Sequence, residues 1–141
     1  MNIKESTSIR VRFNETDPLG IVWHGNYISY FEEGREDFGR KHGLSYLDVQ
    51  RNGYVTPIVE SSSKHLLPLK YGDVALVETT FVDSVSAKII FNYKILNPDG
   101  EVACIGKTVQ VFVDNNGTLA LNFPPFFEAW KRRNGLLKEK I

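Results

Sequence analysis

Apolar and polar residues alternate along several stretches of the chain, and a period of two is typical of half-buried β-strands. The first stretch spans residues 7–13, where Ile9, Val11 and Phe13 share one face. We expect the polar residues 1–6 to lie outside this strand. The chain therefore begins with one strand whose apolar face needs a partner.

A helical period follows over residues 26–42. Tyr27, Phe31 and Phe38 fall on one face, while charged residues occupy most of the remaining positions. Gly43 is a natural helix stop, and two interior glycines indicate that the helix approaches a sheet closely. This segment predicts one long helix that buries an aromatic stripe.

After a short second helix over residues 45–51, the chain is β-structure. Extended or alternating segments, separated by turns rich in Pro, Gly, Asn and Asp, cover residues 54–67, 74–82, 88–96 and 101–113. We expect a bulge at Gly106, because the apolar parity of the last strand changes there. A short helix from Pro124 and a solvated basic tail complete the chain.

This order of elements predicts an α+β fold, with a curved antiparallel β-sheet wrapped around a long central α-helix. The sheet is the only large apolar surface available to cover the buried side of the helix. We find no internal repeat, linker or low-complexity segment. We therefore expect residues 1–141 to form a single domain.

Composition narrows the class of protein. The 141 residues carry a formal net charge of zero, which argues against a general nucleic-acid binder or a binder of anionic membranes. The single cysteine, Cys104, forms no internal disulfide, which favours a reducing compartment. No apolar run has the length of a signal peptide or a membrane span. These features predict a soluble, cytoplasmic protein.

Candidate chemistry is concentrated between the first strand and the long helix. Asp17-Pro18-Leu19-Gly20 reads as a tight turn, and Asn26 is the expected N-cap of the helix. A carboxylate that activates water and free N–H groups at a helix start are the two parts that an acyl-transfer site needs. From the turn alone, Asp17 is as consistent with a simple Asx-turn as with catalysis. No histidine spacing indicates a metal site.

One combination of motifs is more specific. Thr16-Asp17-Pro18-Leu19-Gly20-Ile21-Val22, followed by His24-Gly25-Asn26-Tyr27, resembles the hotdog-fold acyl-CoA thioesterases of the 4-hydroxybenzoyl-CoA thioesterase branch. Further similar pieces follow in the same order: Tyr30-Phe31-Glu32, Pro68 with Tyr71-Gly72-Asp73, and Asp99-Gly100-Glu101 leading to Val111-Phe112-Val113-Asp114. The resemblance spans residues 8 to 114.

The resemblance implies a hotdog domain that hydrolyses an acyl-CoA thioester to a free acid and CoA. Asp17 would act as general base or nucleophile, and the backbone N–H near His24 would polarise the thioester carbonyl. It implies no metal and no bound cofactor, since CoA is part of the substrate. It also implies homodimers that pair into homotetramers, with the acyl site between subunits. The substrate-binding residues would then be Gly25, Asn26, Tyr27, Ser62, Ser63, Lys64 and His65, with Glu60 and Ser61 beside them.

Two other functions stay open at this stage. A hotdog hydro-lyase would pair His24 with Glu32 or Glu33 as its acid and base, which leaves Asp17 without a role. A non-catalytic protein on the same fold would bind acyl-CoA without turnover. The sequence leaves open the acyl chain, the choice between CoA and acyl-carrier-protein esters, and the choice between dimer and tetramer.

Overall fold

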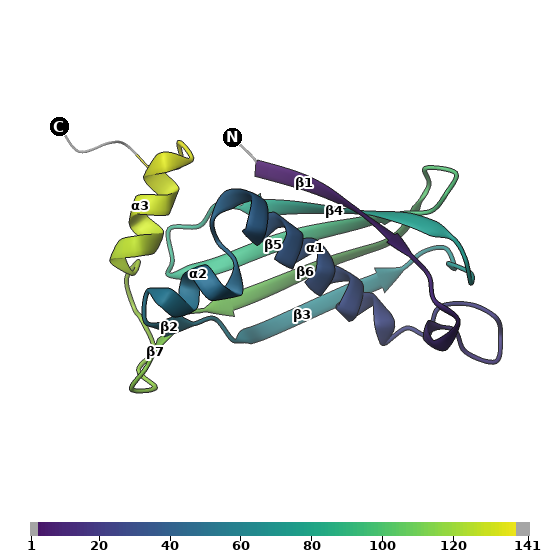
Figure 1. The fold of residues 1–141 in the computed structure, drawn as a ribbon, viewed down its shortest axis with the longest axis horizontal. Coiled ribbons are helices and arrows are strands. Elements are labelled where there is room, and N and C mark those ends of the chain that lie inside the picture. Colours follow the sequence, from purple (N-terminus) through teal and green to yellow (C-terminus); the bar gives the residue numbers. More distant parts are fainter. Residues whose placement is uncertain (1–2, 138–141) are drawn as a thin grey trace.

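A computed structural model of the protein describes residues 3–137, and its largest elements are one five-stranded sheet and one long helix (Figure 1). In chain order the elements are β1 (Ile3–Arg10), a 3-10 turn η1 (Phe13–Glu15), α1 (Asn26–His42), α2 (Tyr46–Arg51), β2 (Tyr54–Val55), β3 (Ile58–His65), β4 (Val74–Val82), β5 (Lys88–Leu96), β6 (Val102–Val111), β7 (Val113–Asp114) and α3 (Pro125–Arg133). The main sheet has the order β1-β4-β5-β6-β3, and every neighbouring pair is antiparallel. The strands β2 and β7 pair separately.

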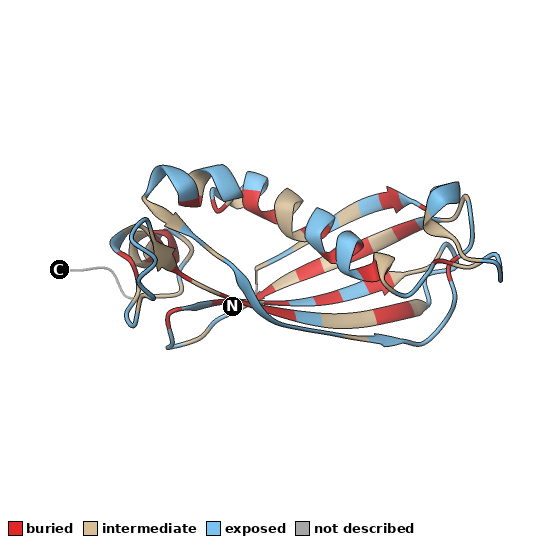
Figure 2. Ribbon diagram, turned by 90° about the horizontal axis from the view of Figure 1, so that it is seen from below, coloured by how far each residue is buried: buried red, intermediate tan, exposed pale blue. Residues whose placement is uncertain are grey.

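Helix α1 lies across one face of the main sheet, and both the helix and the strands beneath it contain buried residues (Figure 2). Its buried side chains include the predicted Tyr27, Phe31 and Phe38. A Cβ atom at Gly34 would lie 2.4 Å from Oγ1 of Thr79 on β4, so only glycine permits this close approach. The predicted α+β architecture is therefore confirmed.

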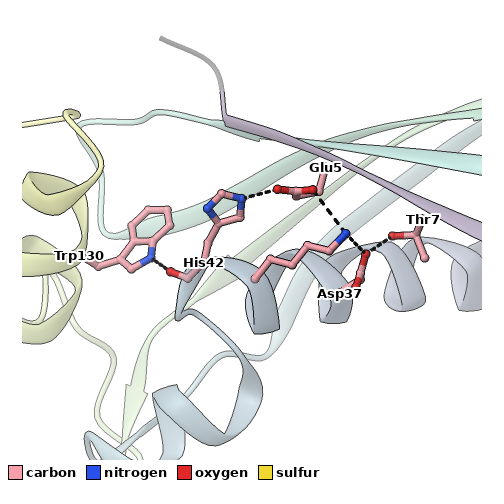
Figure 3. A network of polar contacts seen from close by, with 6 residues as sticks. Glu5, Thr7, Asp37, His42 and Trp130 are labelled. Carbon is pink, nitrogen blue, oxygen red and sulfur yellow. Dashed lines mark hydrogen bonds and ion pairs between the residues drawn. The ribbon is translucent and has the colours of Figure 1, made fainter.

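The first strand begins earlier than the sequence pattern indicates. β1 starts at Ile3, so the expectation that residues 3–6 lie outside it is wrong; residues 1–2 lie outside the described part. The positions that face α1 include Glu5 and Thr7, which bond to the helix as Figure 3 shows. Thr7 donates to Asp37 (2.7 Å), and Glu5 contacts the ring of His42 (2.9 Å). These inward polar residues conceal the strand from a search for apolar alternation.

Phe13 does not face the core, contrary to expectation. The strand ends at Arg10, and the following 3-10 turn directs the Phe13 side chain outward, where it is 75% exposed. Its ring meets the edge of Tyr71 at a centroid distance of 5.7 Å. The alternating pattern therefore continues past the true end of the strand.

The predicted bulge at Gly106 is also wrong in position. Gly106 pairs in unbroken register with Tyr93 on β5 and Ser63 on β3, and a Cβ there would lie 2.2 Å from the Phe31 ring. Glycine is needed at 106 because the helix aromatic occupies that space. The register shifts three residues earlier, at Ala103, since Ile95 pairs with Cys104 and Leu96 with Val102.

At the C-terminus, α3 packs Phe127 and Trp130 against the core, and the indole of Trp130 donates to the carbonyl of His42 (2.6 Å). The expectation of a wholly solvated basic tail fails at Lys131, which is 2% exposed and contacts Asp83 at 2.7 Å. The predicted tail residues 138–140 lie outside the described residues. None of the helices within residues 3–137 is long and apolar enough to cross a membrane.

Candidate functional site

The turn that carries Asp17 is held rigidly by backbone hydrogen bonds. Asp17 N–H donates to the Ile21 carbonyl, and Gly20 N–H donates to the Asp17 carbonyl, both at 2.9 Å. Gly20 closes the turn with a φ of 79°, a conformation that favours glycine. Val22 N–H then donates to the Leu69 carbonyl at 2.8 Å. The loop is thereby fixed against the segment that precedes β4.

The Asp17 carboxylate is half-buried and has one hydrogen bond within residues 3–137. Its Oδ1 accepts from the backbone N–H of Leu19 at 2.9 Å, which is an Asx-turn. The second oxygen, Oδ2, accepts no hydrogen bond from these residues. The predicted turn is present, and it orients a carboxylate with one oxygen left for other chemistry.

The start of α1 differs from the predicted cap. The N-cap residue is Gly25, and the Asn26 side chain instead donates to the Glu15 carbonyl at 2.8 Å. Asn26 N–H donates to the Trp23 carbonyl at 2.9 Å, whereas the N–H groups of His24 and Gly25 find no acceptor within residues 3–137. Two unused donors therefore precede a 17-residue helix, whose dipole makes this end partially positive.

A cavity of about 420 Å³ lies beside this turn and the helix start. It is lined by Asp17, Leu19, Ile21, Val22, His24, Tyr27, His65, Leu66, Leu67 and Pro68. Tyr27 is 3% exposed, burial raises the pKa of its hydroxyl, and its ring meets His65 at 4.8 Å. The His65 ring in turn lies 3.0 Å from Oγ of Ser63. The cavity thus joins a carboxylate, two imidazoles and an apolar lining.

The other predicted site residues lie elsewhere. Gly25 and Asn26 stand at the helix start and do not line the cavity. Gly25 is needed there for packing, because a Cβ would lie 2.1 Å from the Trp23 ring. Residues 62–64 line a second cavity, of about 470 Å³, together with parts of β5 and β6. Asp17, His24, Tyr27 and His65 therefore line one cavity, whereas Ser62, Ser63 and Lys64 line another.

The glutamates of the alternative hydro-lyase site are distant from His24. Glu32 lies six residues beyond Asn26, which is about 9 Å along a helix axis. It lines a third cavity, of about 350 Å³, between α1, α2 and the sheet, whereas Glu33 lies on the exposed side of α1. Neither position is within hydrogen-bond reach of a group held at the helix start. Within residues 3–137 there is also no cluster of three or more His, Cys, Asp or Glu residues suited to hold a metal ion.

Six residues that line the cavity were not predicted as site residues from the sequence: Leu19, Ile21, Val22, Leu66, Leu67 and Pro68. Leu66 and Leu67 both donate their N–H groups to the Ala103 carbonyl, which fixes this segment beyond the end of β3. The available signal was an apolar pair placed next to Pro68 and outside any alternating pattern. Exposed leucines beside a proline are weak indicators until the turn carrying Asp17 is seen opposite them.

Comparison with known proteins shows the family to which the chain belongs. Residues 11–131 match the family described as the thioesterase-like superfamily. The Bacillus subtilis protein YneP, a candidate acyl-CoA thioesterase, is 34% identical over 122 residues, which cover 86% of this chain and 88% of that protein. An Arabidopsis thaliana chloroplast acyl-acyl carrier protein thioesterase, ATL3, is 32% identical over 108 residues, or 76% of this chain and 57% of that protein.

Solved structures agree with this match. A DHNA-CoA thioesterase from Staphylococcus aureus superposes with a TM-score of 0.83 and 28% identity, covering 94% of this chain and 92% of that chain. A mutant 4-hydroxybenzoyl CoA thioesterase in complex with 4-hydroxybenzoyl CoA gives a TM-score of 0.77 over 90% of this chain and 97% of that chain. At 24% identity the second likeness concerns the fold alone. The predicted hotdog fold is confirmed.

Proposed function

Since the chain belongs to the thioesterase-like superfamily, we propose that it hydrolyses acyl-CoA thioesters to a free acid and CoA. One observation carries this proposal. The Asp17 carboxylate lines the same cavity as His24, whose N–H group, like that of Gly25, has no acceptor within residues 3–137. This arrangement supplies both the base or nucleophile and the oxyanion donors that acyl transfer needs.

Two routes begin at the Asp17 carboxylate. As a general base, it removes a proton from water while the water oxygen attacks the thioester carbon. As a nucleophile, its oxygen bonds to that carbon, and water then hydrolyses the mixed anhydride. In both routes the C–S bond breaks and CoA leaves as its thiolate, which takes up the proton held by Asp17 in the first route and a proton from solvent in the second. The hydrogen bond from Leu19 to Oδ1 orients the carboxylate for either role.

The start of α1 stabilises the charge that develops on the carbonyl oxygen. The donors proposed here are the backbone N–H groups of His24 and Gly25, reinforced by the helix dipole. One such donor is worth about 10²–10³ in rate. The His24 imidazole needs no proton-transfer role in this scheme, because the backbone alone provides the interaction.

The apolar lining from Ile21, Leu66 and Leu67 suits the acyl chain or the pantetheine arm, and Tyr27 and His65 border the same space. We propose that Ser62, Ser63 and Lys64 contact substrate from the partner subunit of a homodimer, which pairs further into a homotetramer. β3 supports this assembly because it is a sheet edge and its side chains are largely exposed.

We also propose that the enzyme works in the cytoplasm without a bound cofactor. Cys104, the single cysteine, is buried and forms no disulfide, which suits a reducing compartment.

The deciding measurement is thiol release from a panel of acyl-CoAs: short, medium and long fatty esters and benzoyl-CoA. We expect the wild type to hydrolyse part of the panel, and Asp17→Asn to lose about 10²-fold or more of that rate. Asparagine can still accept the hydrogen bond from Leu19, so the turn is retained. Asp99→Asn, in the exposed turn before β6, is the matched control and keeps full activity.

Equal activity of Asp17→Asn and wild type would remove Asp17 from the site. An altered acyl chain with the thioester intact would instead identify a hydro-lyase. Binding of every ester without thiol release, in wild type and variant alike, would identify a non-catalytic binding protein.

A further inference from the structure

The cavity lined by residues 62–64 opens on the face of the sheet opposite α1. Tyr93 and Gly106 are register partners, and both face the helix: Tyr93 stacks on Phe31 at 4.5 Å, and Gly106 approaches the same ring. Successive strand residues point to opposite faces. The side chains that line this cavity from the far face are therefore Ser62, Lys64, Asn92, Lys94, Ile105 and Lys107.

Three of these side chains are cationic, and the strand register brings them together. Lys64 and Lys94 both pair with Ile105, one from each side, so their Cα atoms lie about 10 Å apart at the usual strand spacing. Lys107 stands two residues along β6 from Ile105, or about 7 Å. All three side chains are exposed. We call this site the lysine cavity.

Among the described residues, the lysines of the lysine cavity have carboxylates near them but form no ion pair with them. Within residues 3–137 none of its three lysines takes part in an ion pair. Glu78, the register partner of Lys94, is paired with Lys4 at 3.6 Å, and Glu60 stands two residues from Ser62 along β3. The chain as a whole has a formal net charge of zero, so this excess of positive charge is a local property.

A structural explanation accounts for one lysine but not for the group. Lysine is a usual residue of an edge strand, so Lys64 on β3 needs no further explanation. Lys94 and Lys107 lie on the inner strands β5 and β6, where no edge needs protection. In the register Lys107 lies diagonally between Lys64 and Lys94, so the three lysines are neighbours on one face of the sheet although no two of them stand directly opposite each other.

We propose that the lysine cavity binds the phosphate groups of a nucleotide. Three ammonium groups supply the charge, the hydroxyl of Ser62 and the amide of Asn92 supply neutral hydrogen bonds, and Ile105 gives an apolar floor. The nucleotide is either that of CoA itself, which rests on the proposed function, or a separate nucleotide. Lys64 is adjacent in sequence to His65, so the lysine cavity and the Asp17 cavity flank the same end of β3.

The first test measures binding of the nucleotide part of CoA, adenosine 3′-phosphate 5′-diphosphate, by calorimetry. We expect Lys64→Met, Lys94→Met and Lys107→Met each to weaken binding about 3-fold, and the triple variant about 30-fold, as for exposed ion pairs. Binding should also weaken with added salt. Lys88→Met is the matched control, since Lys88 lies on β5 and is exposed but does not line the cavity. Asp17→Asn should bind the probe as the wild type does.

The second test identifies the source of the phosphates by comparing an acyl-CoA with the matching acyl-pantetheine, which lacks them. If the phosphates are those of the substrate, the double variant Lys94→Met, Lys107→Met raises KM for acyl-CoA about 10-fold, leaves kcat unchanged and leaves acyl-pantetheine unaffected. If a separate nucleotide binds, the double variant weakens probe binding about 10-fold, and KM stays the same for both esters.

The proposal is overturned if the triple variant binds the probe as tightly as Lys88→Met does. It is also overturned if the lysines are needed only for an acidic protein such as an acyl carrier protein and the nucleotide fails to bind. Lysine-dependent binding in a protein that releases no thiol would leave the lysine cavity standing and reject the proposed hydrolysis.

Discussion

At the level of single residues, Asp17 shows that a turn-forming role and a chemical role do not exclude each other. The hydrogen bond from Leu19 N–H occupies Oδ1, whereas Oδ2 accepts none within residues 3–137. The Asx-turn therefore fixes the carboxylate relative to the helix start instead of competing with catalysis. This is why asparagine, which keeps the turn and removes the charge, is the informative replacement.

Thr79 provides a prediction about stability at the same scale. Its Oγ1 is buried without a hydrogen-bond partner within residues 3–137, beside Gly34 of α1. Because a buried hydroxyl without a partner loses its hydration and gains nothing, we expect Thr79→Val to leave the free energy of unfolding unchanged or to raise it by about 1 kcal/mol. Urea unfolding of both proteins measures the difference.

Thr108→Val is the matched control for this prediction. The Thr108 hydroxyl lies 2.6 Å from Oη of buried Tyr93, so its removal should cost about 1 kcal/mol of stability. If Thr79→Val destabilises the protein as much as Thr108→Val does, then the Thr79 hydroxyl has a hydrogen-bond partner and the prediction is wrong.

At the level of elements, the sequence predicts a segment well where its inward positions are apolar. The alternating residues of β5 and the aromatic stripe of α1 gave the correct elements for this reason. The strand predicted from the sequence begins too late, because Glu5 of β1 faces the helix and makes polar contacts there. Gly106 was assigned to a bulge because its true neighbour, Phe31, is 75 positions away in the chain. Contacts of this kind are fixed by tertiary packing, which a local pattern does not contain.

The contact between β1 and α1 predicts a dependence of stability on pH. Burial acts to raise the pKa of Asp37, but the hydrogen bond from Thr7 and the Lys41 ammonium at 3.0 Å outweigh it, so the net pKa is lowered. A lowered folded pKa adds stability above the ordinary value of 3.8 and loses it as the pH falls further. We expect Asp37→Asn to be less stable than wild type at neutral pH by up to about 1 kcal/mol.

Urea unfolding at pH 7 and at about pH 3 tests this expectation, because the difference between wild type and Asp37→Asn should shrink at the acid pH. Glu36→Gln is the control on the same helix. Glu36 pairs with Arg40 at 3.7 Å and both side chains are exposed, so its loss should cost less than about 0.5 kcal/mol. If wild type and Asp37→Asn differ in free energy of unfolding by the same amount at both pH values, the predicted link between the Asp37 pKa and stability is wrong.

At the level of the whole molecule, Asp17 of the turn and His24 and Tyr27 near the helix start line one cavity, whereas its lining from residues 66–68 was not predicted from the sequence. The position of Asp17 is fixed by hydrogen bonds within residues 17–21, so it can be predicted from the local sequence. The wall of the cavity opposite Asp17 is formed by residues 66–68. Its position depends on the hydrogen bonds from Leu66 and Leu67 to Ala103, and these follow from the register of the sheet. A second chain could add residues to the substrate site only by pairing at an edge of the sheet, which is β1 or β3.

The proposed dimer uses the β3 edge, and this choice can be tested against the β1 edge. Ser61→Lys combined with Ser63→Lys places charges on the helix side of β3, where a paired copy would bring four ammonium groups together. We expect sedimentation velocity to show a smaller species for this variant, with loss of thiol release although Asp17 is untouched. Loss of both properties together would link the site to the interface.

The same change on the opposite edge is the control. Ser6→Lys with Ser8→Lys alters two exposed serines of β1, on the other side of the sheet. Because β1 is not the proposed interface, this variant should keep both its assembly and its activity. If the β1 variant dissociates while the β3 variant does not, the chains pair through β1, and the proposed β3 interface is wrong. If the β3 variant becomes monomeric and stays active, one chain contains the whole site, and Ser62 and Lys64 serve only the lysine cavity.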